Sequence, residues 1–459
     1  MRPCPFISRQ RLFAAIALLF AIPITRAQQL TLTPLKPTAS YEVGEKVGWN
    51  VAVTGGQFAS ATYTLKKNGL TVFKTDTLDL TSGKGTIETS LDEPGTILLN
   101  IRGTGATPAP ADPAATVPAR GNRGGRGGRG GGSAVAGALV APQKLQPSSP
   151  RPADFDTWWE AKIKQLHEIP ANAQLTAADS PKPMVDYFKI TMDNINGAHI
   201  QGQLAKPTGG GKHPALLILQ WAGGTYSLPP SRVVDRAAEG WLALNIEPHD
   251  VAFDQPKAYY DELNRGPLGN FQSIGQTDRE KSYFLAMYLS AYRALDYLTA
   301  RDDWDGKTLV VQGTSMGGQQ SLSMAGLYPK ISAVIVMVPS SCDVTGPEHG
   351  SAAGFPDWAR DAKSKANPKI LETAQYFDPM NFSYHTKAPA LVAMGLLDET
   401  SPAPGVWRAI NQMQGPVEPL PMINSPHQDT PVGVQKPYQV RSQEWLDALV
   451  KTGLPPPRP

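Results

Sequence analysis

Apolar and polar residues alternate in short runs between residues 28 and 103. Examples are "KVGWNVAV", "ATYTLKK" and "TILLNIRG", and turn signals such as "TGG", "KNG" and "DEPG" separate them. Alternation with a period of two places the apolar side chains on one face of a strand. Short strands at this spacing predict a small all-β, immunoglobulin-like sandwich over residues 28–145, with "AVAGALV" as a late strand. The stretch "QPSSPRPA", residues 146–153, is predicted to be a linker.

The pattern changes at residue 154. "DFDTWWEAKIKQL" repeats apolar residues at helical spacing, with Phe155, Trp159, Ile163 and Leu166 on one face. Two strands around an Asn-rich turn follow, and then six apolar strands alternate with helices, the clearest helix being "SYFLAMYLSAYRALDYL". Apolar strands interleaved with helices indicate a parallel sheet that is covered on both faces. An antiparallel hairpin leading into such a sheet is the layout of an α/β-hydrolase. Residues 154–455 are therefore predicted to form a mainly parallel eight-stranded sheet with helices on both faces.

The first 27 residues have the layout of a signal peptide. Arginines at positions 2, 9 and 11 precede the apolar run "LFAAIALLFAIPI", and Ala27 offers a small residue for cleavage. The run is too short for a permanent membrane anchor, so we expect export to the periplasm or the extracellular space, with no transmembrane segment in the mature chain. The mature chain then keeps one cysteine, Cys342, and can form no intrachain disulfide.

The run "RGNRGGRGGRGGGS", residues 120–133, allows two interpretations. Arginines among glycines give a flexible cationic tether that can follow a phosphate backbone, whereas the alternative is a solvated low-complexity loop. The chain has 43 Lys and Arg against 40 Asp and Glu, so the four arginines of this run account for the whole excess. The aromatic residues that stack on bases are missing from the run. We therefore expect a disordered loop at residues 104–133, between two strands of the sandwich, and no nucleic-acid partner.

Residues 313–317, "GTSMG", match the Gly-x-Ser-x-Gly pattern of a nucleophile elbow. The pattern alone is weak, because a chain with this much Gly and Ser can contain it by chance. Its context strengthens it, since the buried strand "TLVVQ" precedes it and the helix "MGGQQSLSMAGLYP" follows it. The elbow requires that order of strand, turn and helix. Ser315 is therefore predicted to be a catalytic nucleophile.

In α/β-hydrolases the acid and the histidine follow the serine along the chain. Of the seven histidines only His427 lies beyond the last parallel strand that ends in an acid, and it is the predicted base. Asp398 ends the strand "ALVAMGLLD" and is the predicted acid, with its neighbour Glu399 pointing away. Asp378 is the rival, but it stands before a proline, where a turn cap is the commoner role.

Acyl transfer also needs two backbone N–H groups that stabilise the oxyanion. We expect one from Met316, which follows the nucleophile, and one from Ala222 in "WAGGTY", the loop after the strand "ALLILQ". No spacing of His, Cys and Glu indicates a metal site, and outside the Gly/Arg run no nucleotide-binding glycine motif is present. The predicted chemistry therefore needs no cofactor: Ser315 attacks a carbonyl, His427 takes its proton, and water releases the acid from an acyl-enzyme.

Three blocks resemble the acetyl xylan esterase and cephalosporin C deacetylase family, carbohydrate esterase family 7. They are "DFDTWWEA", the segment from "YFLAMYLSAYRALDYL" through "GTSMGG" to "VPSSCD", and "GLLDETSPAPGVWRAINQM". The resemblance covers about residues 151 to 452. It implies that Ser315, Asp398 and His427 are the triad, that Ala222 and Met316 are the oxyanion donors, and that acetylated oligosaccharides such as xylan fragments, or small acetyl esters, are the substrates.

The chain departs from the family at two places. Family members carry His-Gly before the first oxyanion donor, where this chain has Gln220 and Trp221. They also carry Arg-Gly-Gln-Gly after the next strand, where this chain has "EPHDVAF". These positions lie around the acyl pocket and the family's subunit contacts. The sequence therefore does not decide whether this chain forms an oligomer like the family's hexameric ring.

Two other functions remain as alternatives. A serine peptidase of the prolyl-oligopeptidase type shares the hydrolase domain, but it carries a propeller or a long specificity domain, which this N-terminal sandwich is too short to supply. A non-catalytic surface-binding protein would rest on the Gly/Arg run alone. Hydrolysis of acetyl esters that depends on Ser315 separates the three.

Overall fold

The computed structural model describes residues 29–104, 132–221 and 225–458. The predicted signal peptide, nearly all of the predicted Gly/Arg loop and Ala222 lie outside these residues. In the described part of the chain, no helix is both long and apolar enough to cross a membrane.

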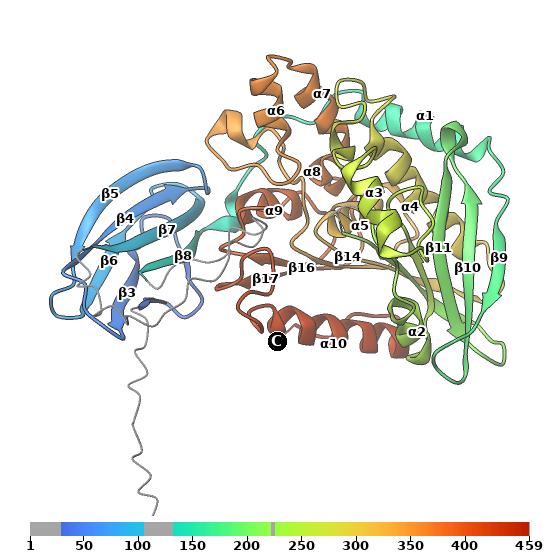
Figure 1. Ribbon diagram of the computed structural model, residues 1–459, viewed down its shortest axis with the longest axis horizontal. Coiled ribbons are helices and arrows are strands. Elements are labelled where there is room, and N and C mark those ends of the chain that lie inside the picture. The colour runs from blue at the N-terminus through green and yellow to red at the C-terminus, as the bar shows by residue number, and fades with distance from the viewer. Residues whose placement is uncertain (1–28, 105–131, 222–224, 459) are drawn as a thin grey trace, which may run out of the picture.

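The N-terminal region is a sandwich of two sheets that enclose their own apolar core (Figure 1). One sheet has the order β1-β3-β6 and the other the order β2-β8-β7-β4-β5. The predicted strands are present, whereas β2 and β5 were not predicted. β2 has only two residues, and β5 lies at a sheet edge with most of its side chains exposed. The strands are β1 (Gln29–Pro34), β2 (Ser40–Tyr41), β3 (Val47–Thr54), β4 (Ser60–Lys67), β5 (Thr71–Asp79), β6 (Lys84–Thr89), β7 (Gly95–Thr104) and β8 (Ser133–Val140).

The larger domain is an α/β-hydrolase built on one sheet, with the order β17-β16-β15-β14-β12-β13-β11-β10-β9. The pairs from β13 through β12 to β17 are parallel, and those that join β9, β10, β11 and β13 are antiparallel. The sheet has nine strands rather than the predicted eight, because the short edge strand β9 is mostly exposed and carries no apolar signal. Its strands are β9 (Gln174–Ala178), β10 (Val185–Asp193), β11 (His199–Pro207), β12 (His213–Leu219), β13 (Leu242–Ile246), β14 (Trp304–Thr314), β15 (Ala333–Met337), β16 (Ala390–Gly395) and β17 (Val417–Met422).

Helices cover both faces of this sheet, so the domain has three layers (Figure 1). The α-helices are α1 (Phe155–His167), α2 (Ser231–Ala238), α3 (Lys257–Arg265), α4 (Tyr283–Thr299), α5 (Met316–Leu327), α6 (Trp358–Ser364), α7 (Lys369–Ala374), α8 (Pro379–Ser383), α9 (Ala403–Ile410) and α10 (Lys436–Thr452). Short 3-10 helices are η1 (Pro142–Lys144), η2 (Ile195–Gly197), η3 (Phe271–Ser273), η4 (Gly346–His349) and η5 (Gln375–Phe377). Apolar side chains of α2 and α10 pack on one face, and those of α1, α4, α5, α8 and α9 pack on the other.

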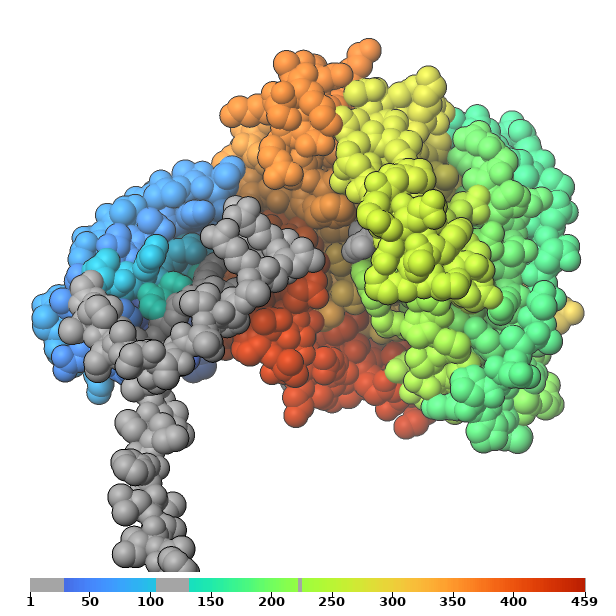
Figure 2. Space-filling model, viewed as in Figure 1, coloured from blue at the N-terminus to red at the C-terminus, as the bar shows by residue number. Residues whose placement is uncertain are grey.

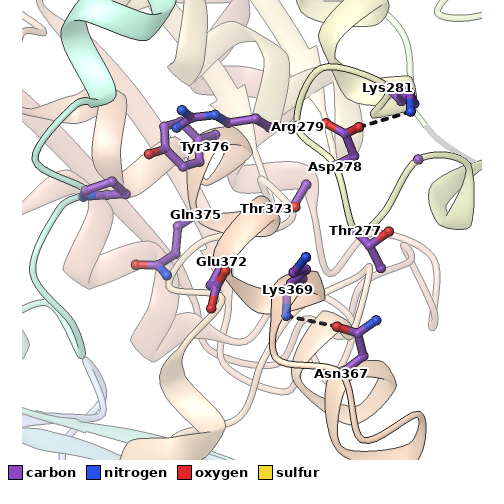
Figure 3. A pocket seen from close by; sticks show the side chains of 12 residues that line it. Thr277, Asp278, Arg279, Lys281, Asn367, Lys369, Glu372, Thr373, Gln375 and Tyr376 are labelled. Atoms are coloured by element: carbon purple, nitrogen blue, oxygen red, sulfur yellow. Dashed lines mark hydrogen bonds and ion pairs between the residues drawn. The ribbon is translucent and has the colours of Figure 1, made fainter.

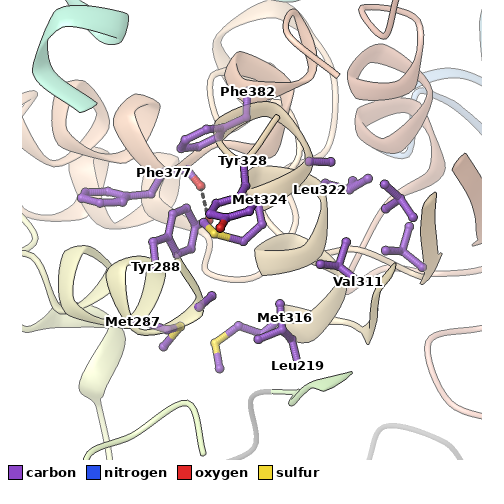
Figure 4. Packing of buried hydrophobic residues seen from close by; sticks show 14 of the residues in the cluster. Leu219, Met287, Tyr288, Val311, Met316, Leu322, Met324, Tyr328, Phe377 and Phe382 are labelled. Atoms are coloured by element: carbon purple, nitrogen blue, oxygen red, sulfur yellow. Dashed lines mark hydrogen bonds between the residues drawn. The ribbon is translucent and has the colours of Figure 1, made fainter. Parts of the chain in front are cut away.

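The core beneath α5 holds the start of that helix in place. Met316, its first residue, is fully buried and belongs to the same cluster as Leu219 at the end of β12 and Met287 of α4 (Figure 4). Tyr288 lies in the same cluster and donates a hydrogen bond of 2.7 Å to the carbonyl oxygen of Phe377. The end of β14 and the start of α5 are therefore supported by close packing from several elements.

The sandwich forms a lobe beside the larger domain (Figures 1 and 2), yet the two share part of a core. Ala39 and Leu139 of the sandwich are fully buried and belong to the apolar cluster of the larger domain. Asn411, just after α9, donates hydrogen bonds of 2.9 and 3.0 Å to the carbonyl oxygens of Pro142 and Leu145. The first lobe is therefore joined to the second by packing as well as by the chain.

Candidate active site

Ser315 occupies the sharp turn between β14 and α5. Its φ of 57° and ψ of −119° are unusual for a residue with a side chain, and such strain is found mainly where function requires it. The flanking glycines permit the turn: a Cβ on Gly317 would lie 2.2 Å from the carbonyl oxygen of Leu219, and one on Gly313 would lie 2.1 Å from that of Gly317. The Gly-x-Ser-x-Gly sequence therefore has the geometry of a nucleophile elbow.

The structure brings Ser315, His427 and Asp398 together from three separate loops. The Nε2 atom of His427, in the loop after β17, lies 3.0 Å from the Oγ atom of Ser315. The Nδ1 atom of the same ring lies 2.8 Å from Oδ2 of Asp398, which follows β16. All three loops leave the sheet at the carboxyl ends of its parallel strands, so a continuous hydrogen-bonded path joins the carboxylate to the serine oxygen.

The Asp398 carboxylate is fixed by its own loop. Its Oδ1 atom accepts hydrogen bonds from the backbone N–H groups of Thr400 at 2.8 Å and Ser401 at 2.7 Å. The side chain is fully shielded from solvent, and that of His427 is 14% exposed. Since Oδ1 is occupied, Oδ2 is the oxygen left to orient the imidazole. Neighbouring Glu399 is exposed, in line with the surface position expected for it.

The rival acid, Asp378, has a different role in the fold. It is the N-cap of α8 and accepts a hydrogen bond of 2.8 Å from the N–H of Met380. Its carboxylate also accepts backbone hydrogen bonds from Asp343 at 3.1 Å and Val344 at 2.8 Å. Burial raises the pKa of this carboxyl to about 7, against the lowering effect of these donors. Asp378 therefore ties two loops together.

The oxyanion donors expected from sequence are described only in part. Met316 is the first residue of α5, so its N–H is one of the helix N–H groups that have no partner within the helix. Ala222 lies outside the described residues. Just before it, the carbonyl oxygen of Trp221 accepts a hydrogen bond of 2.9 Å from the hydroxyl of Tyr226. The Trp221 ring stacks with the ring of Tyr226, and the guanidinium of Arg232 lies over it.

A cavity of about 440 Å³ opens at the serine. Apart from Ser315 and His427, the side chains of its wall were not predicted, because no local pattern in the sequence brings their segments together. Polar and apolar side chains mix in it, which suits a small polar ester. The cavity is lined by Asn264, Leu268, Gly269, Phe271, Gln272, Ser315, Phe355, Thr400, His427 and Gln428.

A larger surface cavity, of about 940 Å³, lies elsewhere and is lined by no triad residue (Figure 3). Its wall mixes charges of both signs, among them Arg279, Lys369 and Glu372. Arg279 forms an ion pair of 2.9 Å with Asp154 and lies over the ring of Tyr376, so its charge is used within the fold. Size alone would therefore have selected a cavity that lacks Ser315, Asp398 and His427. Among the described residues, no group of three or more His, Cys, Asp or Glu side chains could hold a metal ion.

The segment after β13, where the family motif is replaced, contains a buried acid that the sequence did not single out. Glu247 is 2% exposed, and within the described part of the chain neither carboxylate oxygen has a hydrogen-bond partner. Burial raises its pKa well above the usual range for a glutamate. Two residues on, His249 is buried as well, and its Nδ1 atom lies 2.7 Å from the hydroxyl of Tyr283. The His249 ring also packs edge-on against Phe271, which lines the cavity at Ser315, so this segment contacts the wall of that cavity.

Comparison with known proteins shows which family the chain resembles. The family model described as acetyl xylan esterase (AXE1) matches residues 138–440. The acetyl esterase Axe7A of Xylanibacter ruminicola is 31% identical over 283 residues, which is 61% of this chain and 64% of the relative. The chain thus spans less than two thirds of the length of that relative.

Two solved structures share the fold of the larger domain. The acetyl xylan esterase from Paenibacillus sp. R4 matches with a TM-score of 0.56 and 23% identity, over 65% of this chain and 97% of that chain. Acetyl xylan esterase 1 from Thermoanaerobacterium sp. JW/SL YS485 matches with a TM-score of 0.57 and 20% identity, over 67% and 97%. With the family match over most of the larger domain, the chain belongs to the acetyl xylan esterase family of carboxylic-ester hydrolases.

Proposed function

We propose that this protein is an exported serine esterase that removes O-acetyl groups from xylan fragments or similar small acetyl esters. The proposal rests on the hydrogen-bonded path from Asp398 through His427 to Ser315 at the elbow. It also rests on the family to which the chain belongs. No cofactor is required for this chemistry.

The reaction follows from the positions of the three side chains. The Ser315 oxygen attacks the acetyl carbonyl carbon while Nε2 of His427 takes its proton, and Asp398 stabilises the imidazolium through Nδ1. The N–H groups of Met316 and Ala222 are the proposed donors to the oxyanion. The imidazolium then protonates the departing sugar oxygen, which leaves an acetyl-serine. Water attacks this ester with His427 as base, and acetate and free Ser315 result.

The cavity favours a small acyl group on a polar alcohol. Leu268, Phe271 and Phe355 give the wall apolar surface for an acetyl methyl group, and Asn264, Gln272 and Gln428 offer hydrogen-bonding groups for sugar hydroxyls. The names of the relatives, acetyl esterase and acetyl xylan esterase, support the same substrate class.

The proposed organisation of the chain follows the sequence patterns. Residues 1–27 form a signal peptide that directs export, residues 28–145 the sandwich, residues 146–153 a linker, and residues 154–455 the catalytic domain. Cleavage after Ala27 is checked by N-terminal sequencing of the secreted protein.

The test measures acetate release by the chain that starts at residue 28. We expect release from acetylated xylo-oligosaccharides and from p-nitrophenyl acetate, slower hydrolysis of the longer butyrate ester, and no activity above background in Ser315→Ala. Wild-type protein that cleaves proline peptide anilides but no acetyl ester would contradict the proposal, as would a Ser315→Ala variant that keeps the wild-type rate.

A further inference from the structure

We propose that the N-terminal sandwich is part of the catalytic machinery, because two of its glycines, Gly137 and Gly69, position the loop that carries Asp398. This inference rests on the proposed function of Asp398 as the catalytic acid. It assigns the sandwich a task that neither its sequence nor the chemistry of the triad requires.

The first contact is between β8 of the sandwich and the end of β16. Gly137 lies so close to this segment that a Cβ on it would lie 2.7 Å from Cβ of Leu396 and 2.9 Å from the Leu396 carbonyl oxygen. Both distances are shorter than real Cβ contacts. Leu396 stands two residues before Asp398. The backbone of the sandwich therefore touches the start of the acid loop directly.

The second contact is made by the turn between β4 and β5. The carbonyl oxygen of Asn68 accepts a hydrogen bond of 2.8 Å from the N–H of Ala352. Gly69 in the same turn has a φ of +72°, and a Cβ on it would lie 3.1 Å from Cβ of Ala352. Thr71 donates a hydrogen bond of 3.3 Å to the carbonyl oxygen of Gly350. The sandwich thus holds the segment 350–352 by two hydrogen bonds, with the backbone of Gly69 close beside it.

Both contacts lead to the same place in the active site. Phe355, just beyond the held segment, donates its N–H to the carbonyl oxygen of Thr400 at 2.7 Å. The N–H of Thr400 in turn donates to Oδ1 of Asp398. Phe355 and Thr400 also line the cavity at Ser315. The acid loop is therefore held at its start by Gly137 and at Thr400 through the segment that the turn fixes.

A cavity separates the two contacts. Its volume is about 150 Å³, and it is lined by Ile97 and Leu98 of β7 on one side and by Leu396, Asp398 and Pro402 on the other. The backbone of the acid loop is also bonded to the end of β17 and the residues after it, where the N–H groups of Leu396 and Leu397 donate to the carbonyl oxygens of Met422 and Ser425 at 3.1 Å each. From the sandwich, the contacts that reach this loop are those at Gly137 and, through Thr400, at the turn.

Two matched pairs of glycine variants test this inference. Gly137→Ala inserts a methyl group against Leu396. Gly85→Ala, also in a sandwich strand, is its control, because the three atoms nearest to the new Cβ all belong to the Leu78 side chain within the sandwich, the first at 2.9 Å. Gly69→Ala inserts a methyl group beside Ala352 at positive φ. Gly44→Ala carries the same kind of backbone strain, with φ of +77°, and has nothing within 4 Å of the new Cβ.

The readouts are the kcat and KM for p-nitrophenyl acetate and the rate at which a fluorophosphonate labels Ser315, with the melting temperature as a check of folding. We expect Gly137→Ala to lower kcat and the labelling rate by roughly 10- to 100-fold, as displacements of about 1 Å do at active sites, with little change in KM. Gly69→Ala is expected to lower them several-fold relative to Gly44→Ala. Gly85→Ala and Gly44→Ala should match the wild type.

Each outcome decides the question. If Gly137→Ala folds and its kcat and labelling rate lie within twofold of those of Gly85→Ala, the inference is overturned. If Gly137→Ala does not fold, equal kcat and labelling rates for Gly69→Ala and Gly44→Ala overturn it. Labelling needs no substrate, so it reports on the triad even if acetyl esters are not hydrolysed. A wild type that is labelled at Ser315 but hydrolyses no acetyl ester would count against the proposed substrate alone. A wild type that is not labelled at Ser315 overturns both proposals.

Discussion

Replacing Asp398 by Asn should lower kcat strongly, because it stabilises the unproductive tautomer of His427. Oδ1 of Asp398 accepts two backbone hydrogen bonds, from Thr400 and Ser401, so the asparagine must keep its carbonyl oxygen at that position. Its NH₂ group then takes the place of Oδ2, 2.8 Å from Nδ1 of His427. A donor there requires Nδ1 to be the acceptor, which moves the ring proton to Nε2. Nε2 can then no longer accept the proton of Ser315.

The expected loss is large for activity and small for stability. A triad held in the wrong tautomer loses about 10⁴-fold in kcat, which corresponds to about 5 kcal/mol of transition-state stabilisation. The two backbone hydrogen bonds to Oδ1 survive in the variant, so the free energy of unfolding should change by less than about 1 kcal/mol.

Asp378→Asn is the matched control, because Asp378 is the other aspartate that could have been the acid. Oδ1 of Asp378 accepts from Asp343 and Met380, and Oδ2 accepts from Val344. Either orientation of an amide here places an NH₂ group against a backbone N–H, which should cost about 1 to 3 kcal/mol of stability. The kcat of the folded variant should stay within about twofold of the wild type.

The assay combines initial rates on p-nitrophenyl acetate with urea unfolding, both at pH 8. The tautomer argument fails if Asp398→Asn keeps more than a tenth of the wild-type kcat while folded. The assignment of the acid fails if Asp378→Asn is stable and inactive while Asp398→Asn is active.

Four further outcomes follow from the structure. Gly317→Ala, whose Cβ would lie 2.2 Å from the Leu219 carbonyl oxygen, should lose most of its kcat and unfold at lower urea, since relieving the overlap costs roughly 1 to 3 kcal/mol. The sandwich and the catalytic domain should unfold in one calorimetric transition, because Leu139 belongs to the catalytic core, and a separate early transition would contradict this. Cys342 is buried and burial raises its thiol pKa, so native protein starting at residue 28 should not react with a disulfide reagent at pH 8 and should react once per chain after unfolding in guanidinium. Burial raises the pKa of Glu247 in the folded state above its value of about 4.3 in the unfolded chain. The stability it contributes is therefore present at low pH and lost as pH rises through the folded pKa, so Glu247→Gln should reduce the fall in urea stability between pH 5 and pH 8.

Features with a local signal could be predicted from the sequence. The helix expected at residues 282–298 is α4, Tyr283–Thr299, because its apolar spacing and the capping Ser282 lie within one segment. The elbow was predicted for the same reason, since its strand, turn and helix are adjacent in the chain. The order of strand ends and the chain order of the hydrolase fold singled out Asp398 and His427, and the structure places both within hydrogen-bond distance along one path.

Features that depend on tertiary neighbours could not be predicted. The strands β5 and β9 are held by main-chain hydrogen bonds at sheet edges, and their exposed side chains give no apolar pattern. The wall of the cavity at Ser315 combines residues 264–272 with Phe355, Thr400 and Gln428. No local pattern links these segments to one another, because their meeting is decided by the packing of the helices that flank them.

Gly137 shows that the sequence pattern changes between the two domains at a place where their packing is continuous. A glycine inside a strand weakens the strand, and its usual reason is the close approach of another backbone. The sequence therefore indicates that something lies against this position, but the partner, Leu396, comes from a distant strand and has no pattern that links it to the sandwich. The change from alternating to helical spacing near residue 154 marks where one kind of element gives way to another. The catalytic core crosses that boundary to include Leu139, so a truncation placed there would remove a wall of the core and a support of the acid loop along with the sandwich.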